Sequence, residues 1–205
     1  MTAPKLTPRK APRQPRARAT VDAILVAAEQ LSRKLGVSEW TTNHVAERAG
    51  VSIGSLYQYF PSKESLVTAL YLHRRSAHLA RVAAALAELG DARVKDDDAE
   101  LEAARAWLGL TCEDSDWSLD LALREFLLAA GAARKLAPID EQAQRLLAQV
   151  LVRRGLPGHD AARRAFVVLH AVEGVIAAAA RARGEWLTDD AMAKDLALLL
   201  RALRG

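Results

Sequence analysis

The sequence predicts an all-α protein, and three observations support this fold class. Strong helix formers such as alanine, leucine, arginine and glutamate dominate the 205 residues, which contain only 11 glycines and 7 prolines. Aromatic residues, which favour strands, make up 5% of the chain. Apolar residues recur at helical spacing, and no segment alternates cleanly enough between apolar and polar residues to form a strand. We therefore expect helices throughout, in a chain long enough to bury a core.

Three short helices are expected near the N-terminus. They cover about 20–35, 42–49 and, after a cap at Ser52, the residues up to Tyr59. The predicted N-caps are Thr20, Thr41 and Ser52, and the residues predicted to end the helices are Gly36, Gly50 and Pro61. Serine and threonine hydroxyls bond the free amides of a first turn, whereas glycine and proline interrupt the helical backbone.

Longer helices are expected over the remainder of the chain. A fourth helix begins at Ser62 and runs to about Leu89, which makes it long enough to link two domains. After an acidic loop at 96–98, helical patterns recur at about 99–111, 117–133, 139–154, 160–183 and 188–203. The expected organisation is a disordered basic arm at 1–19, a small domain at 20–65 and a larger helical domain at 66–205.

The positive charge of the chain is concentrated at its N-terminal end. Residues 1–75 hold 12 lysines and arginines against 5 acids, a net +7, while the remaining 17 basic and 20 acidic residues give −3. The basic residues of the arm are Lys5, Arg9, Lys10, Arg13, Arg16 and Arg18. Such a proline-punctuated basic segment cannot bury a core, and we expect it to become ordered only on a polyanion such as nucleic acid. The alternative is a solubilising tail.

Cysteine content and hydropathy limit the class of protein. The single cysteine, Cys112, excludes an internal disulfide framework and a cysteine-based zinc cluster, and it fits a reducing cytoplasm. No apolar run approaches the ~20 residues of a membrane span, and residues 1–20 lack the apolar core of a secretory signal. We therefore expect a soluble, cytoplasmic protein without membrane contact.

Residues 45–57 meet the physical requirements of a helix-turn-helix. Ala46 is small enough to face a crossing helix, and Gly50 can adopt the left-handed backbone of the turn. The apolar residues expected to form the shared core are Val45, Val51 and Leu56. Together with the Ser52 cap and the Pro61 stop, this pattern is specific. It predicts that the second helix of the pair lies in the major groove of DNA.

The start of that second helix carries small and polar side chains suited to base edges. Ser52, Gly54 and Ser55 allow close approach, and Gln58 can offer a paired donor and acceptor to an adenine. Ile53 can either touch a thymine methyl group or pack inward. Direct reading of bases is therefore expected from this segment.

Other residues nearby are suited to the phosphate backbone. The hydroxyls of Tyr57 and Tyr59 can reach phosphate, although core packing is the alternative for both rings. Helix starts at Thr41 and Ser62 present free amides that favour phosphate, and Lys63 adds a charge beside the second. The expected DNA contacts are Thr41, Thr42, Asn43, Ser52, Ile53, Gly54, Ser55, Tyr57, Gln58, Tyr59 and Lys63.

The stretch from Thr41 to Lys63 resembles the signature of the TetR family of bacterial regulators. The resemblance is carried above all by residues 49–64, Ala-Gly-Val-Ser-Ile-Gly-Ser-Leu-Tyr-Gln-Tyr-Phe-Pro-Ser-Lys-Glu. It covers about residues 20–70, and the remainder is similar only in helix count and in the pattern His-Ala-Val-Glu-Gly at 170–174. Trp40 stands where the family often has the first of two threonines, so Thr41 is taken as the matching cap.

The resemblance implies a fold of nine or ten helices, a homodimer built on the last two long helices, and a ligand cavity in the C-terminal domain. In that family, ligand binding changes the separation of the two reading heads and releases the operator DNA. The function implied is a transcriptional repressor, released by a mainly apolar small-molecule effector. The alternative is an architectural or scaffold protein that uses the same head without an inducer.

Residues for ligand binding or catalysis are less clearly marked. The aromatic walls and polar anchors expected for a cavity are Trp107, Trp117, Phe126, Arg124 and His170, with structural packing as the alternative. His170 and Glu173 are three residues apart and could form half a metal site or a core pair. The sequence contains no nucleophile elbow and no phosphate-binding glycine loop. We therefore expect no enzyme activity, no cofactor and no metal.

Overall fold

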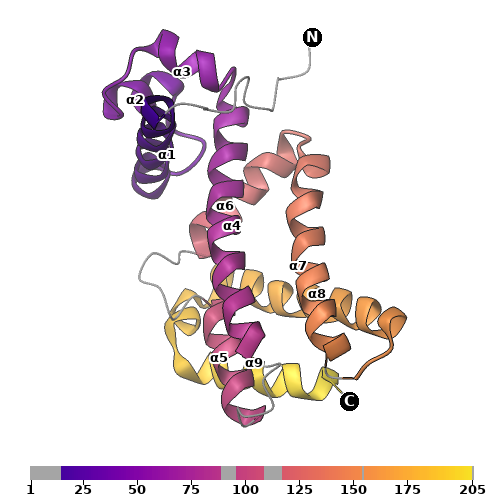
Figure 1. The fold of residues 1–205 in the computed structure, drawn as a ribbon. Coiled ribbons are helices and arrows are strands. Elements are labelled where there is room, and N and C mark those ends of the chain that lie inside the picture. Colours follow the sequence, from indigo (N-terminus) through magenta and orange to yellow (C-terminus); the bar gives the residue numbers. More distant parts are fainter. Residues whose placement is uncertain (1–14, 89–95, 109–116, 154, 205) are drawn as a thin grey trace. The chain divides into compact units, whose positions relative to one another are not determined.

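The computed structural model describes residues 15–88, 96–108, 117–153 and 155–204, and within them the fold is all-α (Figure 1). The helices are α1 (Pro15–Leu35), α2 (Thr42–Arg48), α3 (Ile53–Tyr59), α4 (Lys63–Glu88), α5 (Asp96–Leu108), α6 (Trp117–Ala129), α7 (Ala133–Arg153), α8 (Gly158–Ala182) and α9 (Asp190–Arg204), with a 3-10 helix, η1 (Gly184–Thr188). The described residues contain no strand, which confirms the predicted fold class. Cys112 lies outside the described residues.

Helix α1 begins earlier than the sequence predicted. Thr20, the expected N-cap, lies inside the helix and its hydroxyl donates to the carbonyl of Arg16 at 3.0 Å. Pro15 starts the helix, a position that suits proline because its fixed φ is helical and its missing N–H would have no partner there. Residues 15–19, expected as part of the disordered arm, are therefore helical, whereas residues 1–14 lie outside the described residues.

Three other helix starts also differ from the prediction. The segment 96–98, expected as a loop, forms the first turn of α5, a position in which acidic residues are common in sequences. Helix α7 begins at Ala133 and continues through Pro138. The proline removes only one backbone hydrogen bond, and the buried stripe of Leu136, Ile139 and Ala143, which extends on both sides of it, keeps the helix continuous. The short helix η1, which was not predicted, delays the start of α9 to Asp190.

The chain forms two compact units. Unit 1 comprises residues 1–74 and 119–136, and unit 2 comprises residues 75–118 and 137–205. The largest fully buried side chains of unit 1 are Trp40, Tyr71, Phe60, Ile24, Leu56, Leu66, Leu70, Leu123, Leu127 and Leu136. Trp40 is 1% exposed, and its indole N–H donates to the Ser32 hydroxyl at 2.8 Å, which in turn donates to the carbonyl of Ala28 at 2.7 Å. Truncating such an aromatic residue costs about 3–5 kcal/mol, so Trp40 contributes strongly to the stability of unit 1.

Unit 2 is held together by helix packing and by ion pairs between its helices. Helix α9 packs against α5 and α8, and η1 packs against α8. Arg105 of α5 donates from Nε to Asp190 of α9 at 2.7 Å, and this hydrogen bond lowers the pKa of the Asp190 carboxyl group. Arg201 of α9 pairs with the buried Glu100 of α5 at 2.9 Å. The C-terminal helix is therefore fixed to α5 by charge pairs as well as by apolar contact.

Helix α8 corrects the expectation that no segment could span a membrane. By length and composition alone it is long and apolar enough to do so. In the structure, its buried side packs against α9 and η1, and Glu173 near its middle accepts from Arg75 at 2.5 Å. These are the contacts of a helix in a folded helical domain, and a single apolar helix does not indicate a membrane protein.

Candidate nucleic-acid interface

The turn between α2 and α3 has the geometry that the sequence predicted. Gly50 has a φ of +67°, the left-handed conformation that L-residues rarely adopt. The amide of Val51 bonds back to the carbonyl of Ala46 at 3.0 Å, which closes the turn. Val45 and Leu56 are fully buried and Ala46 is 3% exposed, so the small side chain does lie where the two helices pack. The predicted helix-turn-helix is confirmed.

Both short helices begin with the caps that the sequence predicted. The Thr41 hydroxyl accepts from the amide of His44 at 3.4 Å, while the amide of Thr41 donates to Nδ1 of His44 at 3.4 Å. At the start of α3, the Ser52 hydroxyl accepts from the amide of Ser55 at 3.1 Å. Caps of this kind stabilise a helix by about 0.5–2 kcal/mol, a large contribution for helices this short.

Helix α3 presents small and polar residues outward. Ile53 is 38% exposed and Tyr57 is 42% exposed, and Gly54 and Gln58 are also exposed, whereas Leu56 is buried. The side-chain amide of Gln58 has no hydrogen-bond partner among the described residues, so all its donors and acceptors can be offered to a base edge.

Two of the residues expected to contact DNA are hydrogen-bonded to each other. The hydroxyls of Thr42 and Tyr57 are 2.9 Å apart and hydrogen-bonded, which joins α2 to α3. Thr42 is only 9% exposed, so its hydroxyl orients the Tyr57 side chain. The Ser52 and Ser55 hydroxyls are likewise bonded to each other at 2.8 Å. These pairs fix the rotamers of exposed side chains, and a fixed side chain loses less entropy on binding.

Lys63 is directed toward the protein. Its Nζ donates to the carbonyls of Ser38 at 2.9 Å and Trp40 at 2.6 Å, and it lies 4.4 Å from the centroid of the Trp40 ring. Burial lowers the pKa of Lys63, against the opposing effect of the nearby carboxylates Glu64 and Glu39. Two of the three ammonium N–H groups thus fasten the loop before α2, which leaves one for a phosphate.

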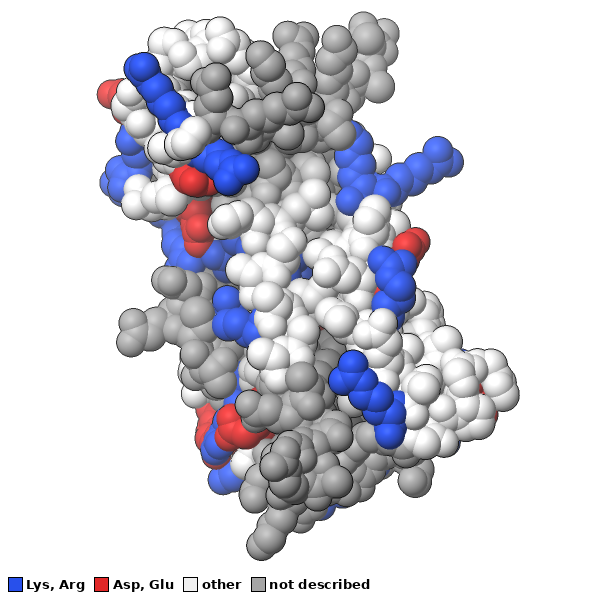
Figure 2. Space-filling model, in the orientation of Figure 1, with Lys and Arg blue, Asp and Glu red and all other residues white. Residues whose placement is uncertain are grey.

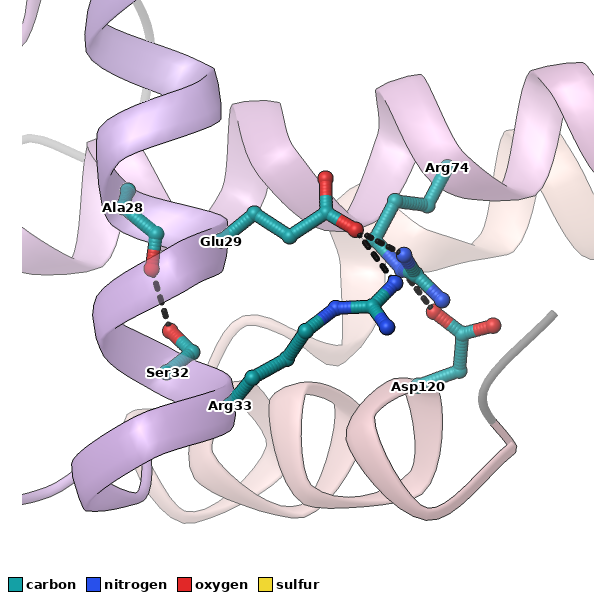
Figure 3. Close-up of polar contacts among 6 residues, drawn as sticks. All are labelled: Ala28, Glu29, Ser32, Arg33, Arg74 and Asp120. Carbon is teal, nitrogen blue, oxygen red and sulfur yellow. Dashed lines mark hydrogen bonds and ion pairs between the residues drawn. The ribbon is translucent and has the colours of Figure 1, made fainter. Parts of the chain in front are cut away.

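An ion-pair network joins α1, α4 and α6 within unit 1 (Figure 3). Arg74 of α4 donates from Nη1 to Glu29 of α1 and from Nε to Asp120 of α6, the latter at 2.5 Å. Arg33 approaches the same carboxylate of Glu29 at 2.8 Å from within α1. Because the Arg74 side chain is only 9% exposed, the network is little screened by solvent and fixes the helix that supports the helix-turn-helix.

The basic charge predicted at the N-terminal end is only partly described. Lys5, Arg9, Lys10 and Arg13 of the arm lie outside the described residues. On the face drawn in Figure 2, basic side chains are scattered among uncharged ones and do not form one continuous patch.

Comparison with known proteins identifies this helical arrangement. Residues 24–70 match the family model described as bacterial regulatory proteins, tetR family. Over this segment the chain is similar to the TetR family. The matched segment contains the whole helix-turn-helix together with most of α1 and the start of α4.

The curated relatives also match only a short part of this chain. The regulator TtgR of Pseudomonas putida is 45% identical over 60 residues, which is 28% of this chain and 29% of that protein. The nucleoid occlusion factor SlmA of Haemophilus influenzae is 36% identical over 63 residues, 31% of this chain and 29% of that protein. The matched segments thus span less than a third of these relatives.

Solved structures are similar over nearly the whole chain. A structure from Mesorhizobium loti has a TM-score of 0.71 at 19% identity and covers 93% of this chain and 97% of that one. A TetR-family regulator from Streptomyces coelicolor has a TM-score of 0.66 at 24% identity, with 91% and 96% covered. At these identities the likeness establishes the fold of the chain and no more.

The residues expected to line a ligand cavity are divided between the two units. Arg124 and Phe126 belong to unit 1, where Arg124 donates to the Tyr71 hydroxyl at 3.0 Å and the Phe126 ring lies 5.4 Å from Nζ of Lys63. Trp107, Trp117 and His170 belong to unit 2.

Within unit 2, these three residues have different surroundings. Trp107 is 4% exposed, and Trp117 donates from its indole N–H to the carbonyl of Leu108 at 3.0 Å. His170 is exposed on α8, and its ring packs edge-on against the ring of Phe166, with the two ring centroids 4.2 Å apart. Glu173, weighed with His170 as half a metal site, is instead paired with Arg75.

Sequence reasoning missed a pair of buried basic residues on α4. Arg75 is 6% exposed and His78 is 7% exposed, and both lie in unit 2 with the buried Leu79 and Val82 of the same helix. The available signal was a basic side chain at a core-facing position of a predicted amphipathic helix, because such residues are rarely buried without a specific partner.

Proposed function

We propose that this chain is a sequence-specific DNA-binding transcriptional regulator of the TetR family, with residues 20–65 as its DNA-binding domain. The observation that carries the proposal is the outward face of α3, where the exposed Gly54 and Gln58 stand on a helix pair fixed by caps and by the buried Leu56. A helix of this kind reads bases in the major groove through its N-terminal residues. No catalytic residue is assigned in this proposal.

Within the helix-turn-helix and the start of α4, we assign base contacts and phosphate contacts to different residues. Gln58 suits an adenine, because its free amide matches the donor and acceptor on that base. Tyr57, whose hydroxyl is held by Thr42, suits a phosphate, as does the remaining N–H of Lys63. Asn43 is exposed at the start of α2 and is assigned to the same backbone.

Selection of duplexes from a random pool tests the proposal directly. The wild-type chain should enrich a near-palindromic site. Gln58→Ala should relax the preference at one base pair in each half-site, because only the base-edge contact is removed. The matched control is Gln142→Ala, because Gln142 is an exposed glutamine on α7, outside the DNA-binding domain. Failure of the wild-type chain to enrich any sequence would contradict the proposal.

We further propose that the regulator acts as a homodimer through the outward side of α8. Phe166 is 52% exposed, Val167 45% and Val175 38%, so this helix keeps an apolar face that its own unit does not cover. His170 and Gly174 follow Phe166 at four-residue spacing and are also exposed. A large exposed apolar face is typical of a subunit interface, and a second copy of this chain would bury it by two-fold symmetry.

Two charge substitutions on α8 distinguish an interface from a core. Gly174→Glu should give folded monomers, because a Cβ at this position meets no atom of the chain within 4 Å. Val172→Glu should unfold the protein, since Val172 is 1% exposed. Sedimentation and circular dichroism separate these outcomes. A wild-type chain that is monomeric at micromolar concentration would refute the dimer. In the dimer, the two DNA-binding domains must stand about 34–36 Å apart, or a multiple of this distance, to reach successive major grooves.

We also propose that a mainly apolar small molecule releases the operator from this cytoplasmic repressor. Such an effector must bind the DNA-free state more tightly, since equal affinity for both states shifts no equilibrium. Compounds that raise the melting temperature should therefore be tested for weaker operator binding. A second function, DNA organisation without an effector, is favoured by the similarity of a 63-residue segment of the chain to SlmA, a nucleoid occlusion factor. Tight ligands that never change operator affinity would support this second function.

A further inference from the structure

Unit 2 contains an arginine whose hydrogen-bonding capacity is only partly used. Arg75 of α4 is 6% exposed, and its Nη2 donates to the carboxylate of Glu173 on α8 at 2.5 Å. Its Nε and Nη1 are also buried, and neither has a hydrogen-bond partner among the described residues. Buried donors in native proteins are nearly always paired, so these atoms point to an acceptor that the described residues do not provide.

The guanidinium group of Arg75 packs against an aromatic ring. The Trp117 ring centroid lies 5.6 Å from Cζ of Arg75, within the range of a cation–π contact. The His78 ring stands edge-on to the same indole, with centroids 5.1 Å apart. The indole N–H is already bonded to the carbonyl of Leu108, so the indole can offer further groups only its apolar surface. The surroundings of Arg75 therefore combine unused polar donors with apolar ring surface.

The charge balance around this arginine favours an anion. Arg81 lies six residues further along α4, about 9 Å at the helical rise, and its buried Nε also has no hydrogen-bond partner among the described residues. Glu173 pairs with Arg75, while Arg81 has no ion pair within the described part of the chain. Of these two arginines only Arg75 has a recorded carboxylate partner, and a further negative group at Arg75 would complete its hydrogen bonds and offset the positive charge of this part of α4.

We propose that unit 2 binds a small molecule carrying a carboxylate, which accepts from Arg75 while the apolar body of the molecule lies against Trp117. A carboxylate suits this position because its oxygens accept charge-assisted hydrogen bonds from a guanidinium group. The inference rests on the proposed function as a ligand-responsive regulator. It narrows the effector class from mainly apolar molecules to apolar acids.

Matched pairs of acids and amides test this assignment. Benzoate with benzamide, 2-naphthoate with 2-naphthamide, and decanoate with decanamide each differ in charge but little in shape. Calorimetry on the full chain without DNA should show that at least one acid binds about tenfold or more tightly than its amide. The preference should disappear in Arg75→Gln. It should persist in Arg105→Gln, a control arginine of unit 2 that is already paired with Asp190 and Glu102.

Arg75→Lys keeps the test decisive if Arg75→Gln fails to fold. Lysine retains the positive charge opposite Glu173 but lacks the Nε and Nη1 donors, so the acid preference should still fall to less than threefold. Equal binding of acids and amides by the wild-type chain, or no binding of any acid, would overturn the inference. A preference that survives both Arg75 variants would also overturn it. Because no DNA is used, failure here leaves operator recognition intact, and failure of operator recognition leaves the acid site standing.

Discussion

Replacing Gly54 with alanine should separate the stability of the reading head from its affinity for DNA. Gly54 is exposed in the first turn of α3, and its φ does not lie in the left-handed range. A Cβ added there would meet only the Ser52 hydroxyl, at 3.9 Å, which is ordinary van der Waals contact. Nothing in the described part of the chain therefore requires glycine at this position.

The two expected effects of this substitution have opposite signs. Alanine is favoured over glycine in helices by about 0.5–1 kcal/mol, so the free energy of unfolding should stay constant or rise by up to about that amount. If a base edge or a phosphate lies against Gly54 in the complex, the added methyl group must displace it. Overpacking of a close contact costs about 1–3 kcal/mol, which corresponds to roughly five- to 150-fold weaker operator binding.

Urea denaturation and fluorescence anisotropy measure these two effects on the same preparations. The matched control is Gly158→Ala at the start of α8, where a Cβ meets no atom within 4 Å. Gly158→Ala should leave operator affinity unchanged. A folded Gly54→Ala protein with wild-type affinity for the selected operator would refute the close approach of α3 to DNA.

Three further predictions concern the described contacts and the arm. Arg74→Gln should lower the free energy of unfolding by about 2–3 kcal/mol in urea titrations, because Glu29 and Asp120 lose their shared partner, and a loss below about 0.5 kcal/mol would contradict this. Burial lowers the pKa of Lys63, so the unfolded chain holds a proton that the folded chain has lost, and stability should rise as pH increases toward 10.5. Lys63→Met should abolish that rise, and an identical pH profile in the variant would exclude this origin. Deleting residues 1–14 removes four basic residues and should weaken binding at low salt and flatten its salt dependence, whereas unchanged affinity would make the arm a solubilising tail.

The features that sequence analysis predicted correctly depend on residues close together in the chain. The left-handed Gly50, the Thr41 and Ser52 caps and the buried Leu56 each follow from a rule that spans only a few positions. Such rules hold because backbone sterics and first-turn hydrogen bonds are local. The motif of the candidate DNA interface could therefore be located within one or two residues.

Helix starts were less predictable where one local preference opposed another. The acidic sequence of residues 96–98 predicted a loop, yet acidic residues are also common in the first turn of a helix, where the structure has them. Pro138 disfavours a helix interior, yet the flanking apolar stripe keeps α7 continuous. In α7 the packing of this stripe outweighed the proline, and packing depends on residues distant in the sequence.

Arg75 shows why the ligand residues were harder to locate than the DNA residues. Its burial depends on Glu173 of α8 and Trp117 of α6, and no spacing rule joins positions so far apart. Its neighbour Arg74 is also little exposed, but its partners are Glu29 and Asp120 of unit 1. Consecutive residues of α4 thus serve different units, because adjacent side chains on a helix point about 100° apart. A carboxylate bound at Arg75 would change the charge on the helix that carries Arg74. Such binding can influence DNA affinity only if the ion pairs of Arg74 and those of Arg75 both change when α4 is displaced. The carboxylate would then have different affinities for the two positions of α4, as linkage requires.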